Sequence, residues 1–213
     1  TVNVGDGAND GTLTGTTTLS GGTLNVNSGS VGTVNGSAGN MTVAETGNPT
    51  NVGAVTNSGM TLTQTGGTIS SLASDAAGAV SNLNGGDISG TTTITDGTVN
   101  VGGGTLTGAT SVATGTLNVT SGTTGAVDIA SGAVNISGTL AGTTVGAVTN
   151  SGGTLTQTGG TVASLASDII GHTRPPAFAS IAGGVTTGCQ YLHVTAKLGW
   201  EHVLMIGRRL QLP

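Results

Sequence analysis

The sequence predicts an all-β protein, a parallel β-solenoid whose short coils stack on one another. Three observations carry this prediction. The chain contains a 93-residue internal repeat, it is rich in Gly, Thr and Val with almost no aromatic residues, and short alternating strand segments recur between turn residues. The repeat weighs most, because self-similarity at a fixed period is the signature of repeat architectures.

The repeat is nearly exact over 24 residues. Residues 52–75 read VGAVTNSGMTLTQTGGTISSLASD, and residues 145–168 read VGAVTNSGGTLTQTGGTVASLASD. The two copies differ only at Met60/Gly153, Ile69/Val162 and Ser70/Ala163.

The repeat also extends upstream. Residues 11–29 match residues 104–122 at 13 of 19 positions, with the same offset. Residues 1–5 match residues 98–102, but at an offset of 97, so four residues were gained or lost between the copies. The difference falls in the Gly/Asp/Asn-rich segment 5–11. Such a composition is typical of a turn, and turns tolerate insertions.

The composition excludes several classes of protein. Of 213 residues 41 are Gly, while charged residues make up 6% and aromatic residues 1%. A core built around Phe, Tyr and Trp is therefore excluded, whereas Val, Ile and Thr suit pleated strands. Residues 1–168 carry eight acidic residues and no Lys or Arg. This charge argues against nucleic acids and anionic membranes as partners, because both require cationic contacts. No run of residues is long enough for a transmembrane helix.

Short segments that alternate apolar and polar residues predict the strands of the coils. Alternation with a period of two indicates a half-buried strand, and Gly-Gly, Ser-Gly, Asp-Gly or Asn-Ser-Gly follows each segment. With roughly 18 to 20 residues per coil, one repeat unit takes about five coils and residues 1–168 about nine. Stacked Val, Leu, Ile, Ala and Thr would fill the narrow core. Examples of the segments are Thr23–Val26, Thr61–Thr65, Thr98–Val101, Thr116–Val119 and Ala133–Ile136.

Coils such as GGTLNVNSGS (21–30), DGTVNVGGGTLTG (96–108) and SGAVNISGTL (131–140) resemble the passenger segments of bacterial autotransporters and related β-helical adhesins. The resemblance covers residues 1 to about 168. It implies a right-handed parallel β-helix at the Gram-negative cell surface, acting in adhesion or aggregation on a host or neighbouring-cell surface, matrix or glycans. We expect the chain to be a fragment of a longer array, with the translocating β-barrel of that family outside it.

The candidate binding residues are threonines in triplets. Alternate residues of a strand share one face, so each triplet places three hydroxyl groups on one side. Such hydroxyls suit a carbohydrate, a host protein, ice or O-glycan attachment, or else form a plain solvated face. Ice binding requires the ladder in nearly every coil, and the intervening coils read TVNV or AVNI. The triplets are Thr61, Thr63 and Thr65; Thr91, Thr93 and Thr95; and Thr154, Thr156 and Thr158.

Two other polar features leave alternatives open. The loop from Asp6 to Asp10 offers oxygen ligands for Ca²⁺, but it is absent from the second copy and a plain surface turn is the better interpretation. Asparagines recur within the strands at positions 25, 100, 118 and 135. They form hydrogen-bonded ladders if they point inward, or a polar face if they point outward, and periodicity alone does not choose between the two.

No catalytic set, metal triad or phosphate-binding loop occurs before residue 169, so we predict no enzyme, no metal and no cofactor. All three His residues, the single Cys and every Lys and Arg follow that position. A carbohydrate-active solenoid enzyme would need clustered carboxylates and basic residues, which makes it the third hypothesis, behind an adhesin-like structural segment and a Thr-ladder binding module for carbohydrate or ice.

The repeat stops inside a unit, and residues 169–213 form a separate, irregular tail. This tail carries a net charge of +3 against −8 before it, together with the aromatic residues of the chain. Three explanations compete: a natural cap or junction, an unrelated or out-of-frame end, and a small module using Cys189, His193 and His202. The second is favoured, since the break falls within near-identical sequence. We expect the tail to pack poorly on the solenoid.

Overall fold

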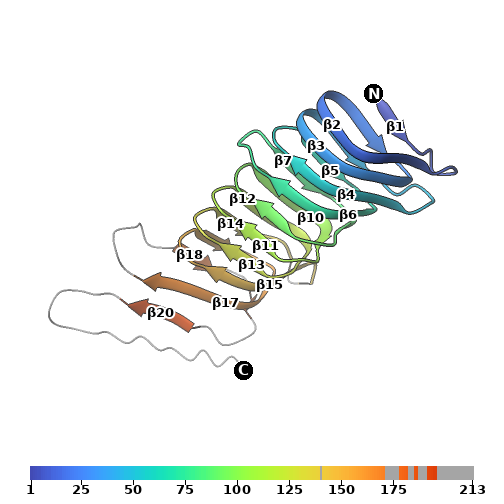
Figure 1. Cartoon of the computed structure of the whole chain (residues 1–213). Coiled ribbons are helices and arrows are strands. Elements are labelled where there is room, and N and C mark those ends of the chain that lie inside the picture. Colours follow the sequence, from blue (N-terminus) through green and yellow to red (C-terminus); the bar gives the residue numbers. More distant parts are fainter. Residues whose placement is uncertain (140, 171–177, 182–184, 187–190, 196–213) are drawn as a thin grey trace, which may run out of the picture.

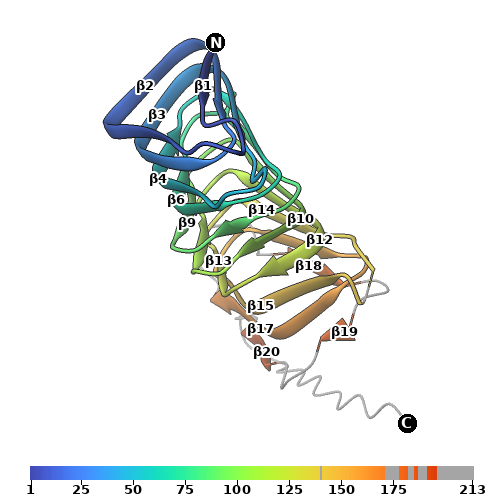
Figure 2. The same cartoon turned by 90° about the vertical axis from the view of Figure 1, so that its right-hand side faces the viewer.

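The computed structural model describes residues 1–139, 141–170, 178–181, 185–186 and 191–195, with side chains up to Ser167. This part of the chain contains strands and no helix, and all strand pairs are parallel (Figures 1 and 2). The predicted parallel β-solenoid is thereby confirmed; its right-handed sense stays a prediction. The strands are β1 (Val2–Val4), β2 (Gly11–Val26), β3 (Gly29–Val43), β4 (Thr50–Asn57), β5 (Thr61–Gln64), β6 (Thr68–Ser74), β7 (Val80–Leu83), β8 (Asp87–Ile88), β9 (Thr92–Ile94), β10 (Thr98–Leu106), β11 (Thr110–Val112), β12 (Thr116–Thr124), β13 (Val127–Ile129), β14 (Ala133–Ile136), β15 (Thr143–Asn150), β16 (Thr154–Gln157), β17 (Thr161–Ile170), β18 (Phe178–Ile181), β19 (Val185–Thr186) and β20 (Tyr191–Thr195).

Within residues 1–167, each coil contributes a strand segment to three faces of the solenoid, and the long strands bend from one face to the next. Face 1 consists of β1, residues 23–26 of β2, residues 40–43 of β3, β5, β7, residues 98–101 of β10, residues 116–119 of β12, β14 and β16. Face 2 consists of residues 11–13, 29–31, 50–52, 68–69, 87–88, 105–106, 123–124, 143–145 and 161–162. Face 3 consists of residues 16–19, 33–36, 54–57, 71–74, 92–94, 110–112, 127–129, 147–150 and 164–167.

The 93-residue repeat corresponds to five coils. One column of paired residues on face 1 runs through Leu24, Met41, Leu62, Ser81, Val99, Leu117, Val134 and Leu155. Five steps along it lead from Leu24 to Leu117 (117 − 24 = 93), as the sequence predicted. The four-residue difference is also placed as expected. The coil from Val2 to Leu24 spans 22 residues, and its counterpart from Val99 to Leu117 spans 18, because the first contains the longer turn between β1 and β2.

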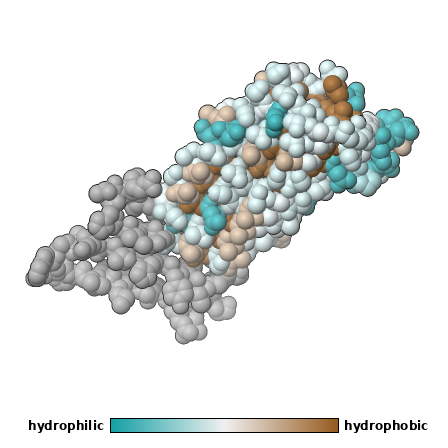
Figure 3. All heavy atoms as spheres, viewed as in Figure 1, coloured by the Kyte–Doolittle hydropathy of each residue, from teal (hydrophilic) through white to brown (hydrophobic). Residues whose placement is uncertain are grey.

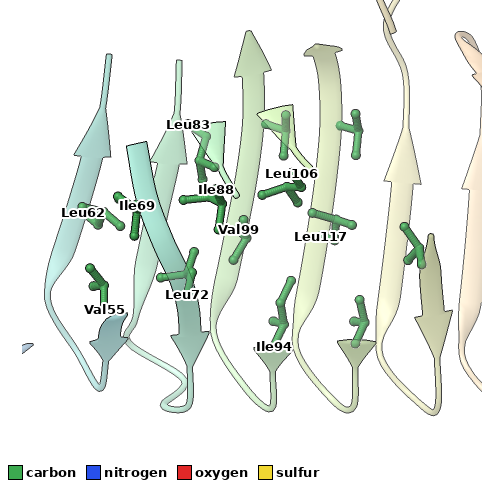
Figure 4. Close-up of a cluster of buried hydrophobic side chains, with 14 of the residues drawn as sticks. Val55, Leu62, Ile69, Leu72, Leu83, Ile88, Ile94, Val99, Leu106 and Leu117 are labelled. Carbon is green, nitrogen blue, oxygen red and sulfur yellow. The ribbon is translucent and has the colours of Figure 1, made fainter. Parts of the chain in front are cut away.

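The core consists mainly of aliphatic side chains stacked coil upon coil, with buried Thr, Ser, Asn and Gln side chains among them. In Figure 4 the side chains of Leu62, Ile69 and Leu72 point into the space between the strands, and those of Ile88, Ile94 and Val99 do the same in later coils. Most of these residues have no accessible surface, and none is more than 9% exposed. Each buried Val, Leu or Ile contributes about 1.5–3 kcal/mol of hydrophobic stabilisation. A solenoid this narrow therefore forms a core without aromatic residues, since neighbouring coils cover each other's inner side.

One of the three differences between the repeat copies has a packing explanation. A Cβ atom on Gly36 would lie 2.1 Å from Sδ of Met60, so the Met60 side chain occupies the space that a side chain at position 36 would fill. In the second copy the position equivalent to Gly36, in the preceding coil, is occupied by Ile129. A Cβ atom on Gly153 would lie 2.4 Å from Cγ2 of Ile129. The same volume is thus filled by the Met60 side chain in the first copy and by the Ile129 side chain in the second. In each copy the partner position, Gly36 or Gly153, has no side chain.

The Asn-Ser-Gly turns are formed around a buried asparagine. Oδ1 of Asn57 accepts hydrogen bonds from the N–H groups of Gly59 (3.2 Å) and Met60 (2.9 Å), and Nδ2 donates to the Val80 carbonyl (3.0 Å) and to Ser81 Oγ (3.0 Å). Asn150 repeats the acceptor contacts in the second copy. The side chain satisfies backbone donors that the change from face 3 to face 1 leaves unpaired.

The described strands of the tail continue the parallel pairing. β18 pairs with β16, and β19 and β20 pair with β17. The sequence of the tail lacks the regularly spaced turn residues of the solenoid, so this continuation was not predicted. The side chains of the tail, those of Cys189, His193 and His202 included, lie outside the described residues, and so does the expectation of poor packing.

Candidate functional surface

The predicted Thr triplets point outward but lie on two different faces. Thr61 and Thr63 and their repeat counterparts Thr154 and Thr156 lie on face 1, with Thr65 and Thr158 directly after it. Thr93 lies on face 3, with Thr91 and Thr95 directly flanking that face. The middle residues Thr63 and Thr156 are half-buried, and the other seven are exposed.

The two triplets on face 1 are not adjacent. Four coils lie between them, and their outward residues are Val80, Asn82 and Asn84; Thr98, Asn100 and Gly102; Thr116, Asn118 and Thr120; and Ala133, Asn135 and Ser137. Complete rows of three threonines therefore occur in two of the nine coils of this face. The surface is a mixed array of hydroxyl and amide groups and not a continuous Thr ladder.

The hydroxyl groups within a triplet differ in their availability. The hydroxyl of Thr65 donates to the Val43 carbonyl of the preceding coil at 3.5 Å, and that of Thr158 donates to the Ile136 carbonyl at the same distance. The hydroxyls of Thr61 and Thr63 make no hydrogen bond to any described residue. The hydroxyls of Thr61 and Thr63 are thus available to water or to a ligand.

An asparagine ladder occupies the middle of face 1. Nδ2 of Asn100 donates to Oδ1 of Asn82 (2.9 Å), Asn118 to Asn100 (2.8 Å) and Asn135 to Asn118 (2.9 Å). These side chains are half-buried and point outward, between inward-facing residues such as Leu117 and Val119. The sequence left a choice between an inward ladder and an outward polar face. The structure combines the two, because parallel in-register strands bring identical outward amides within hydrogen-bond distance.

A second polar column, on face 2, was missed from the sequence. It is outward-facing, runs through all nine coils and contains six threonines. In seven of the nine coils the column residue directly follows a glycine, but Asn51 and Thr144 follow threonines, and coil lengths of 17 to 22 residues hide the alignment in the sequence. The column consists of Thr12, Ser30, Asn51, Thr68, Asp87, Thr105, Thr123, Thr144 and Thr161.

Charge distinguishes the three faces. Among the described side chains, face 1 carries no charged residue, whereas face 2 contains Asp87 and face 3 contains Asp128. Of the remaining acids of residues 1–168, Asp168 belongs to β17 and its side chain lies outside those described, while the others lie in the connecting segments: Asp6, Asp10, Glu45, Asp75 and Asp96. In the space-filling view most of the described surface is pale, as expected for Thr, Ser and Gly, with scattered hydrophilic spots (Figure 3).

The loop considered for Ca²⁺ is closed by its own hydrogen bonds. Oδ1 of Asp6 accepts from the N–H groups of Asn9 (2.7 Å) and Ala8 (3.0 Å), and both carboxylate oxygens contact Nδ2 of Asn9. These bonds, led by that from the Asn9 backbone, hold the pKa of Asp6 below its usual value. Ser28 ties the loop to the next coil, with its hydroxyl donating to the Asn9 carbonyl at 2.9 Å. The geometry is that of a surface turn.

Within the described part of the chain, no three metal-binding side chains of His, Cys, Asp or Glu gather at one place. Nor does any helix there have the length and apolar character required to cross a membrane. Searches of protein-family models, curated proteins and solved structures found no match to this chain.

Proposed function

We propose that this chain is an adhesin-like segment of a secreted or surface-displayed β-solenoid protein. Its stacked coils hold polar faces away from the cell, and these faces mediate adhesion or aggregation. The observation that carries the proposal is face 1, a sheet of nine parallel strand segments whose outward side chains are uncharged hydroxyl, amide and small residues.

The mechanism follows from repetition. Each coil presents two or three weak hydrogen-bonding groups at a regular spacing of about 4.8 Å along the axis. A single row binds weakly. A partner with a matching repeat engages many rows at once, and the gain from simultaneous contacts is large even when each contact is weak. The rigid stack of coils holds the rows in register without further loss of conformational entropy on binding.

Surface display tests this proposal. The whole chain is fused to an outer-membrane anchor in a non-adherent bacterium, and cell settling and attachment to immobilised matrix proteins and glycans are measured. The matched control displays the same anchor with residues 1–168 in shuffled order, which keeps the composition and removes the columns. Settling or attachment above this control is expected. Equal values for the two strains contradict the proposal.

The face 2 column favours a second candidate, a carbohydrate-binding module. Thr105, Thr123, Thr144 and Thr161 stack in four successive coils, and a row of hydroxyls at one coil spacing suits an extended glycan along the axis. Selective retention on one glycan of an array, lost in the variant Thr123→Val with Thr144→Val, supports this candidate. Ice binding receives less support, because complete Thr rows on face 1 are few; thermal hysteresis measures it directly. Release of reducing sugars from polysaccharides would instead indicate the carbohydrate-active enzyme.

A further inference from the structure

We propose that face 1 is a homotypic interface, through which two copies of this chain pack face to face. The inference rests on the proposed function, since it names a second copy as the partner in aggregation. If cells displaying the array adhered to other surfaces while the purified chain stayed monomeric, the homotypic interface would fail and the adhesin function would stand.

Electrostatics selects face 1 among the three faces. The chain has a formal net charge of −5, and residues 1–168 carry eight acids with no Lys or Arg. Two copies therefore repel each other, and like charges brought together in an interface cost several kcal/mol. Faces 2 and 3 would bring Asp87 or Asp128 toward the partner, whereas face 1 brings no described charged side chain.

The shape of face 1 suits sheet-on-sheet packing. Its outward residues are small, mostly Thr, Asn, Ala, Ser and Gly, and stand in straight columns because the strands are parallel and in register. Two such sheets can approach to about 10 Å, the usual separation of stacked sheets. Columns of Asn and Thr with little charge are the composition of the dry interfaces in which paired sheets interdigitate.

The asparagine ladder lowers the cost of removing this face from water. A buried amide without a hydrogen bond costs about 1–3 kcal/mol. In the ladder, Asn100 and Asn118 each use one donor and one acceptor within the column, so fewer groups lose a partner on burial. The free hydroxyls of Thr61 and Thr63 can exchange hydrogen bonds with the partner chain.

The size of the face predicts a weak dimer. Nine strand segments give eight intervals, so face 1 is about 38 Å long at about 4.8 Å per interval, and five residues make it about 17 Å wide. Pairing buries roughly 650 Å² per chain, or roughly 1,300 Å² in total, near the lower end of specific interfaces. We expect a dissociation constant in the micromolar range or weaker in solution, strengthened by multivalency when many copies share a cell surface.

A pair of matched charge variants tests the proposal on the full chain. Thr61→Glu with Thr154→Glu places two acids at exposed positions of face 1. Asn35→Glu with Thr93→Glu places two at exposed positions of face 3, where no acid lies on the neighbouring strands. Mass is followed by sedimentation over a concentration series. The unmodified chain and the face 3 variant should shift toward a dimer, and the face 1 variant should dimerise at least about tenfold more weakly.

Salt dependence provides a second readout that needs no substitution. Added salt shortens the screening length from about 10 Å at 0.1 M to about 3 Å at 1 M, so screening of the acids should strengthen the dimer. The proposal is overturned if the unmodified chain stays monomeric throughout, if both variants weaken association equally, or if salt weakens it. Far-UV circular dichroism and melting curves confirm that the variants keep the fold.

Discussion

The exchange of packing partners between Gly36/Met60 and Ile129/Gly153 gives a quantitative prediction. Met60→Gly removes a fully buried side chain, and Gly36→Ile adds one where Met60 now lies. Each substitution introduces one residue of the Ile129/Gly153 pair of the second repeat copy. The two changes together copy all of it. Gly36 lies in β3 without a positive φ, so its backbone accepts Ile.

The magnitudes follow from the cavity and the clash. Loss of a buried Met side chain costs about 2–5 kcal/mol, and the greater backbone freedom of glycine in the unfolded chain adds to that cost. Gly36→Ile alone overpacks the core and costs about 1–3 kcal/mol or more, because its Cβ would lie 2.1 Å from Sδ of Met60. In the double variant the Ile side chain fills the cavity. We therefore expect a favourable coupling free energy of about 3 kcal/mol between the two substitutions.

Thermal unfolding followed by circular dichroism measures this cycle on four proteins: the unmodified chain, both single variants and the double variant. For a chain of this size about 1 kcal/mol corresponds to about 2–4 °C, so Met60→Gly should lower the Tm by about 10 °C and the double variant should recover most of that loss. Additivity of the two single effects within about 0.5 kcal/mol would refute the packing argument, since residues that do not touch add to that degree.

Three further substitutions test the polar features. Asn118→Ala removes two ladder bonds and should destabilise the fold by about 1–2 kcal/mol in urea unfolding; no loss would show that the ladder is incidental. Asn57→Ala leaves buried backbone donors unpaired and should cost about 3 kcal/mol, against less than about 0.5 kcal/mol for the exposed Thr149→Ala; equal costs would contradict its role in the turn. The pKa of Asp6 is lower in the folded chain than its unfolded value of about 3.9, so its stabilisation is present above that value and lost as the pH falls through the folded pKa. Stability should therefore fall more below about pH 4 in the unmodified chain than in Asp6→Asn, and parallel acid curves for the two proteins would contradict this assignment.

The architecture could be predicted from the sequence because the repeat and the strand period are local signals. Alternation identified the outward side of Thr61 and Thr154, and the near-identity at 93 residues placed both on the same face. The offset of 97 near the N-terminus located the turn between β1 and β2. These inferences required no knowledge of which residues touch across coils.

The functional surface was less predictable, because it depends on register between coils of unequal length. Thr91 has the same local pattern as Thr61, yet it flanks face 3, since the turn before it is placed differently within its coil. The hydrogen bonds of the Asn118 side chain likewise depend on the register with the adjacent coils, which places it beside Asn100 and Asn135. The absence of a side chain at position 153 is likewise explained by a residue of the preceding coil, Ile129, which occupies that space.

The central claim is that residues 93 positions apart stack in one column of the solenoid, five coils apart. Spin labels on Thr61→Cys and Thr154→Cys, in a Cys189→Ser background, measure that separation directly by pulsed electron paramagnetic resonance. Five intervals of about 4.8 Å place the two Cα atoms about 24 Å apart, and a narrow distance distribution consistent with that value is predicted. A broad distribution, or one centred far beyond it, would contradict the stacked five-coil repeat and the surface built on it.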